Sequence, residues 1–225
     1  MKYGIMGAMP DEVDQLCARL SGVEVQQYAG VEYHQGRLGD KEVVVCCAGM
    51  GKANAAATTQ VLCGKFGAQA IIFSGIAGNM SEEIGIGDVV VGKEVCYHDA
   101  EVSMICQSAP FLKSYTGDPA LVQAALDACA ALGVKAIAGR IATGDTFVGD
   151  GATKAVIAEK VHPDCVEMEG AAVSQIAARN GVPCVVLRAM SDNADESGHE
   201  LLVVKKFSIA EYVTTATAIV ARMLE

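Results

Sequence analysis

Short apolar runs alternate with stretches of helical periodicity along the chain, a pattern typical of α/β proteins. Residues 2–8 predict a first strand, and residues 10–20 predict a helix with proline and two acidic residues in its first turn. Turn residues Ala29-Gly30 and Gly39-Asp40 separate the next apolar runs and favour hairpins. The sequence therefore predicts a meander of strands at residues 23–28, 31–38 and 42–48.

The same alternation continues at wider spacing in the rest of the chain. Strands are expected at residues 70–74, 88–97, 135–143, 164–167 and 184–189, and helices at 53–66, 119–132, 151–160, 170–180 and 207–224. This order predicts an α/β fold with a mixed, twisted central sheet and helices on both sides. No repeat, proline-rich linker or abrupt charge shift marks a boundary, so residues 1–225 are expected to form a single domain.

Composition narrows the class of protein. With 225 residues, of which 52% are hydrophobic, the chain can bury a sizeable core. A net charge of -10 with dispersed lysine and arginine makes nucleic acid an unexpected partner. Apolar runs such as residues 68–73 are too short to span a bilayer, and residues 1–7 lack the pattern of a signal peptide. We therefore expect a cytoplasmic protein without membrane association.

The nine cysteines do not form a recognisable framework. Cys46 and Cys47 are adjacent within a predicted strand, most of the others lie in apolar patterns, and no C-x-x-C spacing occurs. Reduced thiols that pack as small hydrophobic groups are expected, rather than disulfides or a metal site.

Charged residues gather at the ends of two apolar strands. Glu167-Met168-Glu169 follows one run, and Arg188 to Asp192 follows the next. If these runs are buried parallel strands, each charge there costs several kcal/mol without a partner. Since open α/β sheets hold small ligands at such strand ends, a ligand site is expected here.

Seven motifs follow one another along the chain: Gly7–Glu12, Gly49–Lys52, Ser74–Gly78, Tyr97–Ala100, Gly144–Phe147, Glu167–Glu169 and Arg188–Asp192. In this order they resemble the motifs of the 5'-methylthioadenosine/S-adenosylhomocysteine nucleosidases, and the resemblance runs from Met1 to the last helix. The resemblance implies a three-layer α/β/α sandwich of the nucleoside phosphorylase type. It also implies hydrolysis of the N-glycosidic bond of these two nucleosides to adenine and a thioribose, without a cofactor.

Two acidic residues are candidates for proton transfer. Asp192 follows a buried strand near other acids, where a raised pKa would let it protonate purine N7, although Ser-Asp also commonly caps a turn. Glu12, like Asp11, stands in a first helical turn, where either side chain could simply compensate the helix dipole. The resemblance implies that Asp192 is the general acid and Glu12 the general base, with Asp11 only a surface residue.

The strand-end residues are candidates for binding ribose. A carboxylate can accept two hydroxyl hydrogen bonds, but strand parity does not choose between Glu167 and Glu169, and either could pair with a cation. By resemblance, Glu169 binds the ribose hydroxyls above Met168, Glu167 is a weaker candidate, and Arg188 anchors the water or the acids. Ser191 is expected in the same site.

Further contacts are implied by resemblance alone. Phe147 and Val148 match residues at the adenine ring, and Met9, Met50 and Phe207 match the pocket for the sugar and its 5'-alkylthio group.

The glycine-rich segment 74–78 would let the backbone approach a ligand, which places Ile76, Ala77 and Gly78 in the site. Ile76 stands where the family commonly has a serine. That departure argues against a phosphate site.

The segment after the Tyr97–Ala100 motif matches the family's dimer contact. The pair His98-Asp99 lacks the further spaced donors that a metal site needs. By resemblance we expect a homodimer in which Met104, Ile105 or Phe111 lies near the partner's pocket.

Other functions stay open at this point. A purine nucleoside phosphorylase has the same fold, but it needs cations for phosphate, and Arg19 is the single cation between residues 6 and 20. A nucleosidase could prefer 5'-deoxyadenosine or aminofutalosine. A non-catalytic nucleoside-binding protein would be expected to lack one of Glu12, Glu169 and Asp192.

Overall fold

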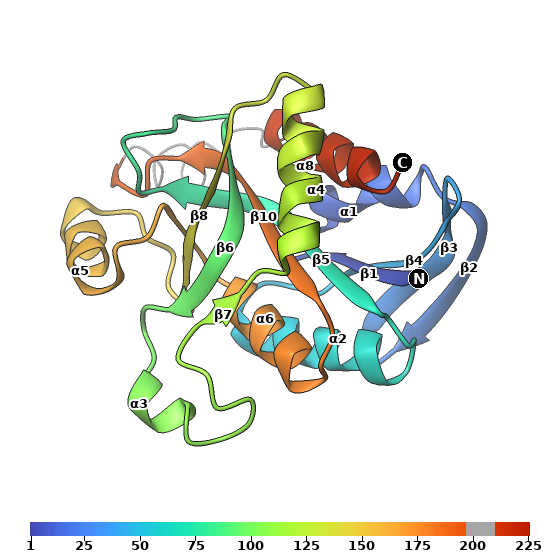
Figure 1. The fold of residues 1–225 in the computed structure, drawn as a ribbon, viewed down its shortest axis with the longest axis horizontal. Coiled ribbons are helices and arrows are strands. Elements are labelled where there is room, and N and C mark those ends of the chain that lie inside the picture. Colours follow the sequence, from blue (N-terminus) through green and yellow to red (C-terminus); the bar gives the residue numbers. More distant parts are fainter. Residues whose placement is uncertain (197–209) are drawn as a thin grey trace.

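The computed structural model describes residues 1–196 and 210–225, and its strands form one ten-stranded sheet (Figure 1). The strands are β1 (Lys2–Gly7), β2 (Ser21–Tyr28), β3 (Val31–Leu38), β4 (Lys41–Cys47), β5 (Ala70–Asn79), β6 (Val89–Tyr97), β7 (Tyr115–Thr116), β8 (Ala136–Thr143), β9 (Cys165–Glu167) and β10 (Cys184–Asp192). The helices of the described residues are α1 (Pro10–Cys17), α2 (Lys52–Gly64), α3 (Val102–Ile105), α4 (Pro119–Ala131), α5 (Gly151–Val161), α6 (Gly170–Arg179) and α8 (Ala210–Met223).

The sheet runs in the order β10-β6-β8-β9-β5-β1-β4-β3-β2, with β7 paired to β6. An additional pairing of β10 with β5 closes a ring of five strands, from which β1, β4, β3 and β2 extend. Because β1 and β10 both run parallel to β5, the carboxyl ends of these three strands lie at the same edge of the sheet. Small ligands bind at this edge in α/β proteins.

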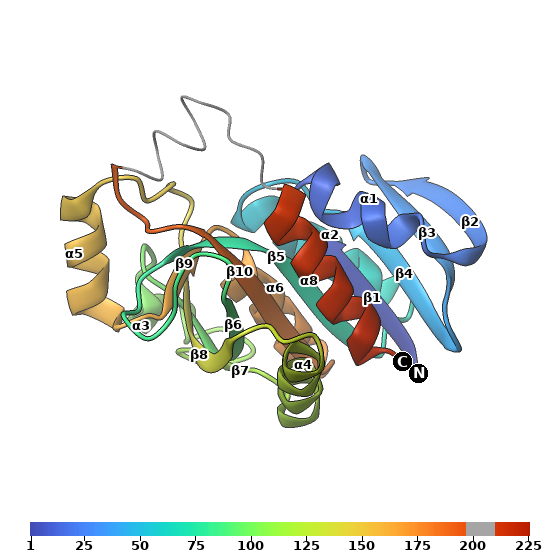
Figure 2. The same cartoon turned by 90° about the horizontal axis from the view of Figure 1, so that it is seen from above.

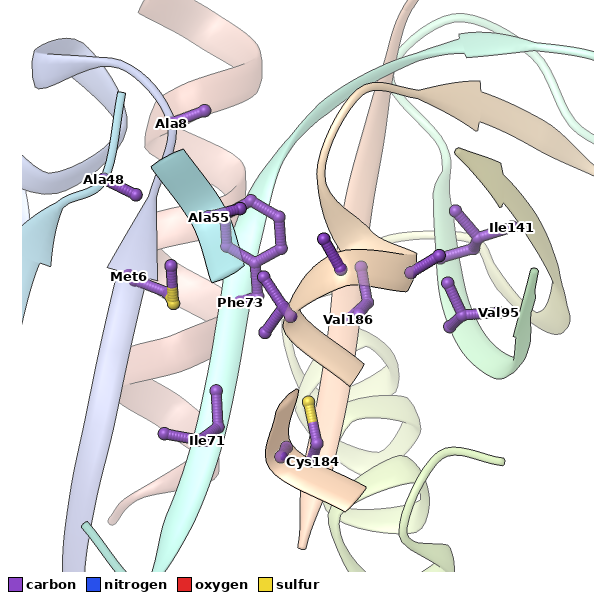
Figure 3. Close-up of a cluster of buried hydrophobic side chains, with 14 of the residues drawn as sticks. Met6, Ala8, Ala48, Ala55, Ile71, Phe73, Val95, Ile141, Cys184 and Val186 are labelled. Carbon is purple, nitrogen blue, oxygen red and sulfur yellow. The ribbon is translucent and has the colours of Figure 1, made fainter. Parts of the chain in front are cut away.

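Helices cover both faces of the sheet (Figures 1 and 2). The helices α1, α4 and α8 pack together on one face, and α2 packs with α6 on the other. Since side chains alternate along a strand, neighbouring Ile5 and Met6 of β1 enter different cores. Figure 3 shows Met6 in the core on the α2 side of the sheet, with Phe73 of β5 and Ala55 of α2. The expected three-layer α/β/α sandwich with a mixed sheet is confirmed.

The helix α5 lies to one side of these layers (left in Figure 1). Its Ile157 belongs to a third, smaller cluster that also contains Ala142 of β8, Val166 of β9 and Ala194. This cluster packs α5 against the chain segment that follows β10. That segment begins directly after Asp192, where β10 ends at the ligand-binding edge of the sheet.

Two strands are longer than the sequence predicts. β5 continues to Asn79 and β10 to Asp192, because the two strands stay paired as far as Gly78 and Asp192. Arg188 therefore lies within a strand instead of ending one. The two strands that end in acidic residues, β9 and β10, were expected to be parallel strands. Each is parallel to one neighbour only, because β9 pairs antiparallel with β5 and β10 pairs antiparallel with β6.

Short elements between β6 and α4 were not expected from the sequence. They are the four-residue helix α3 and the two-residue strand β7, both too short for a periodic pattern. In the described ranges, no helix is long and apolar enough to cross a bilayer. All nine cysteines are free.

Candidate active site

One cavity of about 380 Å³ lies where β1, β5, β9 and β10 end. Its volume is within the range of small-molecule sites. The loop before α2 and the loop after β8 complete its wall. The residues expected from the sequence that line it are Met9, Glu12, Met50, Ile76, Ala77, Gly78, Phe147, Glu167, Met168, Glu169, Arg188, Ser191 and Asp192.

The structure differs from the expected set at a few positions. Val148 is buried and lines a smaller adjoining cavity together with Phe147 and Asp192. Phe207 lies outside the described residues. Ala8 and Val166 line the main cavity without having been expected, and neither carries side-chain chemistry that a sequence could reveal. Asp11, exposed in the first turn of α1 as expected, also lines the cavity, which the sequence did not indicate.

Glu12 is held by the backbone on three sides. Its Oε2 accepts hydrogen bonds from the N–H groups of Ala8 at 2.7 Å and Met9 at 3.0 Å, and its Oε1 accepts one from Ile76 at 3.1 Å. The side chain turns back over the start of α1, as a glutamate at this helix position does in a capping box. Burial raises the pKa of Glu12, against the lowering effects of Arg188 and these N–H groups.

Two glycines make room for this carboxylate. A β-carbon at Gly75 would lie 2.5 Å from Glu12 Oε1 and closer still to Arg188 Nη1. A β-carbon at Gly7 would lie 2.7 Å from the Glu12 β-carbon. Glycine is therefore required at Gly7 of β1 and Gly75 of β5 because protein side chains pack directly on the backbone there.

Arg188 is fully enclosed, with 1% of its surface exposed. Its Nη2 contacts the Glu167 carboxylate and lies 3.5 Å from Glu169 Oε2, and its guanidinium carbon lies 4.2 Å from the centre of the Phe73 ring. The buried cation therefore balances two neighbouring carboxylates, which would otherwise be costly to bury.

Glu167 is fully occupied by protein groups. Besides Arg188, its carboxylate accepts hydrogen bonds from the Thr143 hydroxyl and from the N–H groups of Glu169 and Gly170, at 3.1 and 2.7 Å. These contacts join β8 and β10 to the start of α6. Although Glu167 lines the cavity, the geometry supports a structural role for its carboxylate rather than the ligand contact considered from sequence.

Glu169 is held less completely. Its Oε1 accepts a hydrogen bond of 2.7 Å from the N–H of Gly51. Burial and the charge of Glu167 raise the pKa of Glu169 to about 7, although Arg188 and the Gly51 N–H act in the opposite direction. Its remaining lone pairs are free to accept hydrogen bonds from a ligand.

A polar network at the rim fixes the Gly51 amide. Lys52 Nζ lies 2.7 Å from Asp99 Oδ2, and the same oxygen accepts a hydrogen bond of 2.9 Å from the Asp145 N–H. Asp145 Oδ1 in turn accepts one of 2.9 Å from the Lys52 N–H at the start of α2. Asp99 of the His98-Asp99 motif therefore forms the ion pair with Lys52 that orients the loop containing Gly51.

Asp192 is buried and lines both the main cavity and the smaller adjoining one. Its Oδ2 accepts a hydrogen bond of 2.8 Å from the Ser191 hydroxyl, and its Oδ1 accepts one of 2.8 Å from the Ala194 N–H. From α5, Lys154 Nζ donates to the carbonyl oxygens of Asn193 at 2.6 Å and Asn79 at 3.2 Å. The turn after β10 is thus tied to the end of β5, and it holds the carboxyl group in place.

The arrangement suits a neutral, hydroxylated ligand. The carboxyl groups of Glu12, beside Gly75, and Asp192, beside Gly78, stand at separate positions in the cavity wall. Glu169 in the same wall can accept hydroxyl hydrogen bonds. Arg188 is the one cationic residue among the described residues that line the cavity, and it is already paired. A phosphate dianion would meet more negative than positive charge here.

Comparisons with known proteins agree with this description. The family model of the phosphorylase superfamily matches residues 2–225. The 5'-methylthioadenosine/S-adenosylhomocysteine nucleosidase of Shewanella sediminis is 42% identical over 201 residues, 87% of this chain and 87% of that protein.

Solved structures are similar over the whole chain. The crystal structure of the corresponding nucleosidase from Colwellia psychrerythraea in complex with adenine has a TM-score of 0.92 and 32% identity, covering 100% of this chain and 94% of that one. A futalosine hydrolase of Helicobacter pylori has a TM-score of 0.88 and 29% identity, covering 100% of this chain and 97% of that one.

Proposed function

Because the chain belongs to the phosphorylase superfamily and, within it, to the 5'-methylthioadenosine/S-adenosylhomocysteine nucleosidases, we propose that it hydrolyses the N-glycosidic bond of these two nucleosides. The products are adenine and the corresponding 5-thioribose. The observation that carries the proposal is the position of buried Glu12 and Asp192 in one cavity, with Glu169 also in its wall.

Asp192 is the general acid in this proposal. Its proton passes to N7 of the purine, so the bond between C1' and N9 breaks with the electron pair on a neutral adenine. Phe147 and Val148 line the adjoining cavity beside Asp192, where the ring would lie. The structure of the relative from Colwellia is a complex with adenine, which supports a purine ligand.

Glu12 is the general base. Its Oε2 already accepts two N–H groups, whereas Oε1 accepts one and keeps a lone pair for a water molecule. The water oxygen attacks C1' as positive charge develops on the ribose, and its proton passes to Glu12. A raised pKa makes the Glu12 carboxylate a better proton acceptor than an ordinary glutamate.

Glu169 binds the ribose hydroxyls. A carboxylate facing two hydroxyl groups orients the sugar, and its negative charge stabilises the oxocarbenium-like transition state. Met168 lies beside it and offers an apolar surface to the sugar. Arg188 keeps Glu169 in position from the protein side, since its Nη2 lies 3.5 Å from the Glu169 carboxylate.

Two related reactions are alternatives. Phosphorolysis is disfavoured, because the charge of Arg188 is balanced by Glu167 and Glu169 and Ile76 brings an apolar side chain to the cavity. Hydrolysis of a futalosine-type nucleoside is the second candidate, supported by the similarity to the Helicobacter hydrolase.

A homodimer is part of the same proposal. The segment around α3 exposes large apolar side chains, with Met104 63% and Phe111 69% exposed, and Ile105 is partly buried between them in sequence. Such side chains favour contact with a second copy of the chain. The single domain and the cytoplasmic location stay predictions from the sequence.

Release of adenine from each nucleoside, measured in phosphate-free buffer and again with phosphate, tests the proposal. Adenine together with free thioribose in the absence of phosphate is the expected result. Strict dependence on phosphate would establish a phosphorylase. Release of adenine from aminofutalosine, and not from the two thionucleosides, would make the second candidate correct.

A further inference from the structure

Six charged residues line the cavity in the described part of the chain: Asp11, Glu12, Glu167, Glu169, Arg188 and Asp192. Five of them are buried and hydrogen-bonded or ion-paired to other protein groups. Asp11 differs, because its side chain is exposed and makes no hydrogen bond or ion pair with a described residue. The reaction mechanism does not use it.

Asp11 lines the main cavity but not the smaller adjoining cavity assigned to adenine. The adjoining cavity is lined by Phe147, Val148 and Asp192. Asp11 belongs to the first turn of α1, next to Met9. With adenine at Asp192 and ribose at Glu169, the side of the cavity formed by Met9, Asp11 and exposed Met50 is left for the 5' substituent.

The two nucleosides of the proposed function differ in that substituent alone. 5'-Methylthioadenosine has a methylthio group, for which Met9 and Met50 are sufficient partners. S-Adenosylhomocysteine has an amino-acid tail that carries an ammonium and a carboxylate. A free aspartate at the open side of the cavity is complementary to the ammonium.

We propose that Asp11 is a specificity-determining residue that accepts a hydrogen bond from the α-ammonium of the S-adenosylhomocysteine tail. The inference rests on the proposed function and extends it to one group of one substrate. Because Asp11 is exposed, the interaction has the modest strength of a solvated ion pair. Removing it should change the preference between the two nucleosides by about twofold to fivefold.

The test compares Asp11→Asn with the wild-type enzyme, using the ratio of kcat/KM for S-adenosylhomocysteine to that for 5'-methylthioadenosine. The matched control is Asp14→Asn, which removes the same charge from an exposed position of the same helix that does not line the cavity. The ratio should fall by about twofold to fivefold in Asp11→Asn alone, and the difference should shrink as salt is added.

Two substrate analogues identify the group that Asp11 contacts. With hydrogen in place of the amino group of the tail, Asp11→Asn should act like the wild type relative to 5'-methylthioadenosine. With hydrogen in place of the tail carboxylate, the loss should persist. Loss with the analogue that lacks the amino group would overturn the assignment to the ammonium.

The remaining outcomes separate this inference from the proposed function. An unchanged ratio in Asp11→Asn, or an equal fall in Asp14→Asn, would overturn the role of Asp11 while adenine release still supports the nucleosidase. Absence of adenine release from both nucleosides by the wild-type enzyme would overturn the proposed function, and the inference with it.

Discussion

The Glu12 carboxylate on α1 accepts a hydrogen bond of 3.1 Å from the backbone N–H of Ile76 on β5, 64 positions later in the chain. Two further N–H groups, from Ala8 and Met9, point at the other carboxylate oxygen. The proposed general base is therefore also the acceptor that joins the start of α1 to the central sheet. A substitution at Glu12 should affect both reaction and stability.

Glu12→Gln tests this double role. An amide has one acceptor oxygen, so at least one of the three backbone N–H groups loses its partner, and the free energy of unfolding should fall by about 1–3 kcal/mol. Turnover should stop, because an amide cannot accept the proton of water. Urea unfolding and adenine release measure the two effects. A variant that still hydrolyses the nucleosides would remove Glu12 from the role of general base.

Asp192→Asn should lower kcat without lowering the stability of the fold. The amide oxygen can still accept the Ala194 N–H, and the new amino group can donate to the Ser191 hydroxyl, so the variant should fold normally. We expect kcat to fall by about 100- to 10,000-fold with adenine still bound. Calorimetric titration with adenine and single-turnover kinetics check this. Unchanged turnover would exclude Asp192 as the acid.

Gly75→Ala should displace two buried side chains of the site. Its β-carbon would lie 2.5 Å from Glu12 Oε1 and also clash with Arg188, and both side chains are buried with nowhere to move. A displacement of this kind should lower kcat/KM by about 100-fold. The control is Gly85→Ala, where a β-carbon meets nothing within 4 Å. Equal activity of the two variants would contradict the packing described.

The raised pKa of Glu169, about 7 compared with an ordinary 4.5, predicts a dependence on pH. Between pH 4.5 and 7 the folded protein keeps a proton on Glu169 that the unfolded chain has lost. The contribution of Glu169 to the free energy of unfolding is therefore present below about pH 4.5 and is lost as the pH rises through about 7. Ribose binding should show the opposite trend, since the ionised carboxylate is the better acceptor.

Urea unfolding and KM, each measured across this pH range, check both trends. Glu169→Gln should remove part of the pH dependence of stability. A KM that stays constant from acidic pH to above 7 would show that the ionisation of Glu169 does not control substrate binding.

Lys154→Met should loosen the turn that holds Asp192. Its Nζ donates to the Asn193 and Asn79 carbonyls, and without it the turn after β10 loses this link to the end of β5. We expect kcat to fall by about tenfold with a smaller change in KM, and Lys154→Arg to recover part of the loss. Lys160→Met is the matched control, because that lysine of α5 donates to the His98 carbonyl instead. Equal kcat losses in the two methionine variants would contradict a positioning role for Lys154.

The parts of the fold that were predictable are those with a local cause. The hairpin strand β3 was expected at 31–38 and observed as Val31–Leu38, because turn residues stand at both of its ends. The ends of β5 and β10 were placed too early. Their last residues are polar or glycine and read locally as a turn, yet the two strands remain paired there.

The same division applies to the site. Motif resemblance led to most of the residues that line the cavity, but the separate tasks of neighbouring acids depended on their surroundings. Glu167 and Glu169 are two positions apart, and only the packing of Thr143, Arg188 and the start of α6 around Glu167 distinguishes them. Asp11 looked like a helix-dipole partner, and its place in the cavity wall became evident from the structure.

By itself the sequence determined the alternation of strands and helices, the family, and the acidic residues at the strand ends, because periodicity and motifs are properties of consecutive residues. Only the tertiary structure decided which of these acids is bound by protein and which still has lone pairs for a ligand. That depends on strands distant in the sequence, as when the Ile76 amide reaches Glu12 and Arg188 reaches Glu167. Hydrogen-bond partners across a sheet depend on pairing and register, which no local pattern specifies.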